Sequence, residues 1–307
     1  MVKYYLFLII TLALPFSALG KPNGNNWQDQ ESCLTHPIEC IEYIDSKLPT
    51  IKKYSHLWYN LNNNLLFALW ESGKEQRHKK ELADIELDKG PPVFLTTVYT
   101  MKAKFAALDG YLVQARQYVT RAVELIKAVN EVSENMTRYS EIVVLYTSYL
   151  KDHDKAEAFA HWVEKEKAGT TNLVQMVSFN TAVGHLYSHK KEFKKAREYY
   201  QKALAGNLKT NFPARIALAY HNVARSYQLE EKYGEAIEYF TLSLTHYQKL
   251  GVRYETKGDY TRLRFIETLL KAERFQQARY VFSQIDSEIL NVYFVPLYQQ
   301  VKQLLDE

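Results

Sequence analysis

His185 and His189 are the two residues whose types and spacing come closest to a chemical site. They lie four positions apart in a stretch with helical periodicity, so both side chains fall on one helix face, a spacing that metal ligands use. A zinc site needs further ligands, and no third one follows nearby in the sequence. The pair therefore predicts a polar helix face or groove, with a zinc site as the alternative.

No other stretch has a familiar catalytic pattern. The chain contains no glycine-rich phosphate loop, no G-x-S-x-G and no H-E-x-x-H, which are signatures of phosphate binding, serine hydrolysis and zinc proteolysis. Paired carboxylates such as Glu230 and Glu231 fall in a predicted turn, where solvated side chains explain them. We expect a protein with no catalytic residue, cofactor or metal. An enzyme with a site built around His185 and His189 is the alternative.

The amino-acid composition indicates which broad classes of protein the chain can belong to. Of the 307 residues, 47% are hydrophobic and 24% are charged, which is typical of an ordinary soluble chain. The net charge of +4 is small, and the basic residues are interspersed with acidic ones, so we expect no nucleic-acid partner. The 11 glycines and 8 prolines are too few for an all-β fold with many tight turns.

The first twenty residues have the pattern of a secretory signal peptide. Lys3 precedes an apolar run over residues 4–14, and the small residues Ala18 and Gly20 follow, as signal peptidase prefers. The run is shorter than the roughly 20 residues that span a membrane. Cleavage before Lys21 is therefore predicted, and an uncleaved anchor is the alternative. The mature chain is expected in the periplasm, or secreted if the source has no outer membrane, and not integral to the membrane.

Cys33 and Cys40 are the only cysteines of the chain. Export would place them in an oxidising compartment, where disulfides persist. One continuous helix would hold them about 10 Å apart, too far for a disulfide. Pro37, however, is well placed to open a new helix between them. We predict a Cys33–Cys40 disulfide, with two free thiols as the alternative.

Helical hairpins recur along the chain at intervals of about 40 residues. Two copies match at five positions with one offset of 40: Gly184, Tyr187, Phe193, Ala196 and Tyr200 pair with Ala224, Tyr227, Tyr233, Ala236 and Phe240. Weaker copies follow at offsets of 42, 40 and 41 and contain Ala278, Ala156 and Ala115. The small residues are predicted where two helices approach closely. Tyr200 and Phe240 are predicted to fill the space to the neighbouring hairpin, because hairpins of this kind must stack to bury both faces.

This order of small, aromatic and alanine positions resembles the tetratricopeptide repeat. That repeat usually spans about 34 residues, whereas the copies here recur every 40 to 42, so longer helices are expected. The resemblance, notably to exported bacterial regulatory and sensory regions, implies an all-α fold: an α-solenoid of antiparallel helix pairs in a right-handed superhelix. We expect about five units over residues 91–290, a helical cap with degenerate repeats over 21–90, and a capping helix over 291–307.

In this family the first helix of each pair lines a concave groove. Carrying the groove positions onto this sequence predicts a partner-binding groove made of Lys104, Glu141, Thr181, His185, His189, His221, Asn222, Arg225, Gln228, Glu267 and Lys271. Asn222 matches the asparagine with which many peptide-binding members hold a ligand's backbone. At each of these positions a solvated helix face is the alternative.

The resemblance therefore implies a non-catalytic, exported scaffold that binds a protein or peptide in this groove. The mix of His, Arg, Gln and Lys suits a peptide with some acidic character. Regulation of an envelope signalling or assembly system is the setting that the resemblance suggests. The alternative classes are a small-molecule or metal-binding sensor and the enzyme considered above.

Overall fold

The chain is all-helical in the part that the computed structural model describes. The described residues are 33, 37–132, 136–166, 173–210, 213–249, 255–288, 290 and 294–306. They belong to two compact units, residues 14–168 and a unit that contains residues 169–307. The predicted signal peptide, residues 1–20, lies outside the described residues. The all-α class is confirmed, while the superhelical handedness and the predicted domain limits stay predictions.

Among the helices described, none combines the length and the apolar character that a membrane crossing requires.

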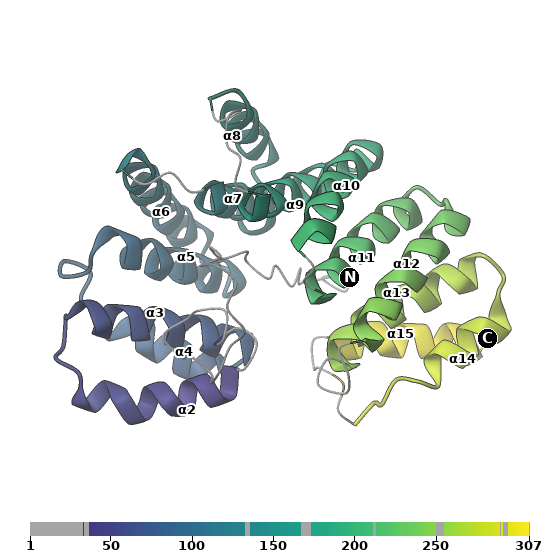
Figure 1. Ribbon diagram of the computed structural model, residues 1–307, viewed down its shortest axis with the longest axis horizontal. Coiled ribbons are helices and arrows are strands. Elements are labelled where there is room, and N and C mark those ends of the chain that lie inside the picture. Colours follow the sequence, from purple (N-terminus) through teal and green to yellow (C-terminus); the bar gives the residue numbers. More distant parts are fainter. Residues whose placement is uncertain are drawn as a thin grey trace. The chain divides into compact units, whose positions relative to one another are not determined.

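The first unit is built from paired helices (Figure 1). Its elements are α2 (Pro37–Lys47), η1 (Leu48–Thr50), α3 (His56–Glu71), α4 (Glu75–Ala83), α5 (Pro92–Leu108), α6 (Leu112–Val132), α7 (Met136–Val144), η2 (Leu145–Tyr149) and α8 (His153–Glu166). η2 is a π-helical turn that continues α7. The hairpins are α3 with α4, α5 with α6, and α7–η2 with α8, and α2 packs on α3.

The second unit repeats the same arrangement. Its helices are α9 (Leu173–His189), α10 (Phe193–Thr210), α11 (Pro213–Leu229), α12 (Tyr233–Gln248), α13 (Glu255–Lys271), α14 (Phe275–Phe282) and α15 (Val295–Asp306). α9–α10, α11–α12 and α13–α14 are hairpins, and they stack because α10 packs on α11 and α12 on α13. α15 packs against α13 and α14, in the segment where the sequence predicts a capping helix.

The first helix of every described hairpin ends with a residue whose backbone is in the left-handed conformation, with positive φ. These residues have φ between 54° and 87°: Gly73, Gly110, Lys151, Lys191, Glu231 and Glu273. The last five recur at intervals of 41, 40, 40 and 42 residues, the same intervals as the sequence repeat. A non-glycine residue adopts this conformation at a cost of about 1–2 kcal/mol. The turn geometry is therefore kept even where glycine is absent.

The backbone hydrogen bonds explain why the turn is kept. In the α11–α12 turn, the amide of Lys232 donates to Tyr227 O at 3.0 Å and that of Glu231 to Gln228 O at 3.0 Å. This pattern is a Schellman motif, which satisfies carbonyls at the helix end. In the turn between η2 and α8 the amide of Asp152 reaches one residue further back, to Tyr146 O at 2.9 Å. The π-helical turn accommodates that extra residue.

Alanine occupies the fifth position after the left-handed residue in five hairpins. The five are fully buried: Ala115, Ala156, Ala196, Ala236 and Ala278. Each lies in the first turn of the second helix, where a larger side chain would separate the paired helices. The predicted small positions are therefore confirmed as buried contact points.

His78 takes the alanine position in the α3–α4 hairpin. It is fully buried, and its ring meets the Phe105 ring edge-on with the centroids 4.9 Å apart. Within the described residues, neither ring nitrogen has a hydrogen-bond partner. Burial, and to a lesser extent the charge of Lys104, lowers the pKa of His78 to about 3. The sequence repeat does not identify this hairpin, because the position that is alanine in the other five hairpins is histidine here.

Gly184 in α9 lies in direct contact with α10. A Cβ atom added there would lie 2.5 Å from two ring carbons of Tyr200. Tyr200 therefore packs across its own hairpin, and the expectation that it also fills the gap to the next hairpin stays a prediction. Phe240 does reach the next hairpin, since its ring centroid lies 5.9 Å from that of Phe265 in α13.

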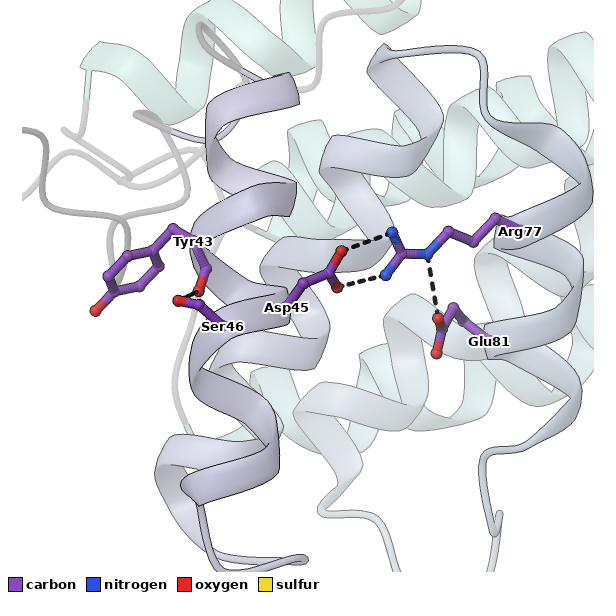
Figure 2. A network of polar contacts seen from close by, with 5 residues as sticks. All are labelled: Tyr43, Asp45, Ser46, Arg77 and Glu81. Carbon is purple, nitrogen blue, oxygen red and sulfur yellow. Dashed lines mark hydrogen bonds and ion pairs between the residues drawn. The ribbon is translucent and has the colours of Figure 1, made fainter.

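A disulfide and an ion pair both involve α2. Cys33 and Cys40 form a disulfide, which is fully buried in a cluster with residues of α2 and α3. The guanidinium of Arg77 in α4 donates two hydrogen bonds to Asp45 in α2, one of them 2.9 Å long (Figure 2). These bonds are the main cause of the raised pKa of Arg77. Because both side chains are partly exposed, the ion pair contributes at most about 1 kcal/mol.

Replacing Gly184 by alanine should lower the free energy of unfolding by about 1–3 kcal/mol, because the new methyl group would overlap the Tyr200 ring. Urea denaturation followed by far-UV circular dichroism measures the change. Gly234→Ala is the matched control, since Gly234 is exposed in α12 with no heavy atom within 4 Å of the added Cβ. The control should be neutral or stabilising by up to about 1 kcal/mol. Equal stability of the two variants would refute the close contact.

His78→Leu should make the first unit less sensitive to acid. The folded-state pKa of His78 is about 3 against an ordinary value of 6.5, so below pH 6.5 the unfolded chain takes up a proton that the folded chain refuses. Stability is then lost as the pH falls from 6.5 towards 3, by up to about 1.4 kcal/mol per pH unit. All four tryptophans belong to residues 14–168, so tryptophan fluorescence during urea titration reports this unit. An unchanged pH slope in the variant would contradict the assignment.

Candidate functional site

The first helices of the second unit carry nine of the eleven predicted groove residues. Thr181, His185 and His189 are in α9, His221, Asn222, Arg225 and Gln228 in α11, and Glu267 and Lys271 in α13. The structure brings several of these together with residues that were not predicted. We call this set the polar cluster; it consists of His185, Tyr200, His221, Arg225, Gln228, Tyr260, Thr261, Arg264 and Glu267.

His185 is held inside the polar cluster as a neutral imidazole. Its Nδ1 atom lies 2.7 Å from the hydroxyl of Tyr200, and the residue is buried. Burial, with a smaller effect of His189, lowers the pKa of His185 to about 3. The Tyr200 contact occupies Nδ1 and fixes the orientation of the ring. Across the described residues, no group of three or more His, Cys, Asp or Glu side chains is placed to hold a metal ion.

His221 repeats this arrangement one hairpin further on. Its Nδ1 atom lies 3.0 Å from the hydroxyl of Thr261 in α13, and its ring centroid lies 5.2 Å from that of Tyr260. Burial lowers the pKa of His221 to about 3, and the charges of Arg225 and Arg264 act in the same direction. At neutral pH both histidines are therefore uncharged.

Arg225 is a half-buried cation in α11, four residues after His221. Its guanidinium donates a hydrogen bond to the side-chain oxygen of Gln228, and Gln228 in turn donates to the backbone carbonyl of Arg264 at 3.2 Å. Burial, followed by repulsion from Arg264, lowers the pKa of Arg225 to about 10. The group therefore stays charged at neutral pH in surroundings that disfavour the charge.

Arg264, unlike Arg225, has an acidic partner. It donates to Glu267 at 2.8 Å and to the hydroxyl of Tyr260 at 3.3 Å. Burial lowers the pKa of Arg264, but the attraction of Tyr260 and Glu267 outweighs it, so the pKa is raised overall. Glu267 therefore neutralises Arg264, and Arg225 is left without a carboxylate at ion-pair distance in the described part of the chain.

The other predicted residues of the second unit are Thr181, His189, Asn222 and Lys271. The hydroxyl of Thr181 donates to the carbonyl of Val177 in its own helix at 2.9 Å. Asn222 and His189 are half-buried, and Lys271 is exposed. Asn222 lies next to His221 on α11 and is partly accessible. Its predicted role, holding the backbone of a ligand, stays a prediction.

Lys104 and Glu141 lie in the first unit. Lys104 is buried, with its Nζ atom 5.1 Å from the centre of the Trp70 ring. Burial raises the pKa of Glu141, and the charge of Lys104 partly opposes this effect. These two residues interact with each other, but the structure does not place them relative to the nine residues of the second unit. A single groove containing all eleven is therefore still a prediction.

Tyr200, Tyr260, Thr261 and Arg264 are site residues that the sequence analysis missed. The sequence predicts only packing for Tyr200, because its position is aromatic in both clear repeats. Arg264 had a usable signal, since it lies 42 residues after Asn222, the interval between these two hairpins. Stepping Asn222 forward by this interval identifies Arg264 from the sequence.

Comparisons with known proteins agree with the repeat geometry. The model of the tetratricopeptide repeat family matches residues 176–260, from α9 into α13. No curated protein matches the sequence significantly.

Solved structures of helical-repeat proteins share the fold. The apo form of RapI is 14% identical with a TM-score of 0.57, covering 91% of this chain and 85% of RapI. NprR in complex with its cognate peptide NprX is 15% identical with a TM-score of 0.55, covering 91% and 82%. A Rap protein complexed with Competence and Sporulation Factor is 12% identical with a TM-score of 0.56, covering 92% and 76%.

The family match and the recurring hairpins identify the same segment. Matching turn, alanine and packing positions extend from that segment into neighbouring hairpins of both units. Residues 176–260 therefore match the tetratricopeptide repeat family, and the described part of the chain shares an all-helical fold with RapI and NprR.

Proposed function

We propose that this chain is a non-catalytic scaffold that binds a peptide or a peptide-like segment of a protein at the polar cluster. The observation that carries the proposal is the convergence of hydrogen-bonding side chains from three consecutive first helices, α9, α11 and α13. A ligand lying across these helices would meet Arg225 and Glu267 of the cluster and the neighbouring Asn222, which are all partly exposed. The repeat positions thus offer successive polar contacts to an extended chain.

The structural comparisons support a binding role. NprR is described in complex with its cognate peptide NprX, and a Rap protein in complex with Competence and Sporulation Factor. At 12–15% identity the likeness concerns the fold, so the chemistry of any ligand has to come from the residues of this chain. The internal hydrogen bonds of His185 and His221 favour a role in positioning over a role in catalysis.

The proposed setting is the cell envelope. The N-terminal sequence has the charged start, apolar run and small residues of a signal peptide. The Cys33–Cys40 disulfide fits an oxidising compartment. We infer that the chain is exported to the periplasm, or secreted, and that it acts there in an envelope signalling or assembly system.

Peptide binding can be tested with arrays of random synthetic dodecapeptides probed with the purified protein. We expect a subset of peptides to be retained, and the Asn222→Ala/Arg225→Ala double variant to bind them at least about tenfold more weakly, the loss expected for central contacts. Arg279→Ala is the matched control, because Arg279 is an exposed arginine on the second helix α14. Failure of the wild type to retain any peptide, or equal binding by the double variant, would overturn the proposal.

Export can be tested by expressing the full chain in a bacterium and sequencing the N-terminus of the mature protein. The expected mature protein begins at Lys21, because the preceding small residues suit signal peptidase. Substituting charged residues into the apolar run should leave the precursor uncleaved. A mature chain that retains its first twenty residues would contradict cleavage.

A further inference from the structure

The turn between α5 and α6 carries three consecutive apolar residues that are exposed to solvent. The exposed fractions of Tyr111, Leu112 and Val113 are 64%, 52% and 75%. Single exposed apolar residues are common on protein surfaces. Three in succession at the end of a hairpin instead form one continuous apolar surface, and we call these three residues the apolar tip.

The repeat does not require apolar residues at the tip. Tyr111 and Val113 stand one and three positions after the left-handed residue Gly110. In the other five described hairpins these two positions carry charged residues, amides or glycine: Lys74, Gln76, Asp152, Asp154, Glu192, Lys194, Lys232, Gly234, Arg274 and Gln276. The same backbone turn therefore forms with polar residues, and the apolar surface is a property of this one hairpin.

Two ion pairs connect the turn of the apolar tip with the turns on either side. Lys79 in α4 lies 2.8 Å from Asp109, which directly precedes Gly110. Arg116 in α6 lies 3.9 Å from Asp152 in the turn between η2 and α8. The apolar tip is therefore the middle one of three neighbouring turns along one edge of the first unit.

The two outer turns add positive charge to this edge. Lys74 lies in the α3–α4 turn and Lys151 in the turn between η2 and α8, and both are exposed. Neither lysine forms an ion pair with an acidic residue in the described part of the chain, whereas Asp109 and Asp152 are both paired with other cations. The nearby Asp154 is exposed as well, so the unpaired charges of the edge sum to a net positive charge.

We propose that the apolar tip docks on the surface of a membrane that contains anionic lipids. Tyr111, Leu112 and Val113 would enter the boundary between headgroups and acyl chains, where tyrosine is favoured. Lys74 and Lys151 would stay at the level of the headgroups and be attracted by the anionic lipids. The inference goes beyond peptide binding, because it concerns a turn edge of the first unit and not the polar cluster.

A membrane surface fits the apolar tip better than a second copy of the chain. Three partly exposed side chains offer on the order of 300 Å² per molecule, below the 800 Å² or so that each partner buries in a stable protein interface. Two copies meeting at this edge would also bring their unpaired lysines together, which is unfavourable. Anionic headgroups supply the opposite charge instead.

The test measures binding of the full chain to sucrose-loaded vesicles by sedimentation. The vesicles consist of phosphatidylcholine alone or of phosphatidylcholine with 30% phosphatidylglycerol, a fraction of about one anionic lipid in three that gives a negative surface. Every protein carries Leu8→Asp and Leu12→Asp, because the N-terminal apolar run would itself bind lipid. Far-UV circular dichroism checks that each variant is folded.

Leu112→Gln/Val113→Gln removes apolar surface without changing the charge. We expect it to bind the anionic vesicles at least about tenfold more weakly than the parent chain. Leu208→Gln/Leu242→Gln is the matched control, since these leucines are 48% and 42% exposed in helices of the second unit, and it should bind like the parent.

The charge contribution is tested separately with Lys74→Gln/Lys151→Gln. We expect this variant to bind the anionic vesicles at least about fivefold more weakly, because each cation near an anionic surface contributes roughly that factor. Its binding to phosphatidylcholine alone should equal that of the parent chain. The parent chain should itself prefer the anionic vesicles by a similar factor.

Three results would overturn the proposal. The first is a parent chain that does not sediment with anionic vesicles, and the second is equal binding by the parent and Leu112→Gln/Val113→Gln. The third is a parent chain that is dimeric in sedimentation velocity while Leu112→Gln/Val113→Gln is monomeric, which would assign the apolar tip to a second copy. Because no peptide is present, these results are independent of the peptide-binding proposal.

Discussion

The turn between the two helices of each hairpin is the constraint on which the rest of the structure depends. One left-handed residue must end the first helix so that the last carbonyls find amide partners and the chain can reverse direction. Glycine meets this need without strain at Gly110, whereas Lys191 and Glu231 adopt the same conformation at a cost. The stability gained from pairing and stacking the helices exceeds that cost, so the backbone geometry is conserved from hairpin to hairpin while the residue type changes.

The turn also sets where small residues are needed. It brings the start of the second helix against the end of the first, and the alanine five positions later is buried between them. In the α3–α4 hairpin, His78 stands in place of this alanine, and its ring packs on Phe105. The geometry accepts this larger residue when its neighbours are aromatic, but it leaves a titratable group in an apolar environment. Packing and acid sensitivity are thus linked at one repeat position.

A repeated backbone with changing side chains explains the polar cluster. His185, Arg225 and Glu267 occupy one repeat position in three successive first helices. These three residues have similar surroundings but different charges. The net charge of the polar cluster therefore depends on which residue each repeat carries at this position. Glu267 is paired with Arg264, whereas Arg225 donates to the neutral side chain of Gln228. The same stacking that stabilises the second unit therefore produces a desolvated cation on one face of it.

The sequence by itself determined the helical hairpins, their interval and the buried alanines, because helix periodicity and turn geometry are local properties that recur every 40 to 42 residues. It also supported the Cys33–Cys40 pairing through the position of Pro37. Only the tertiary structure decided that Tyr200 packs on Gly184 within its own hairpin, that His78 replaces an alanine, and that Glu267 bonds to Arg264. These outcomes depend on the distance between side chains of different helices, a quantity that repeat spacing does not contain.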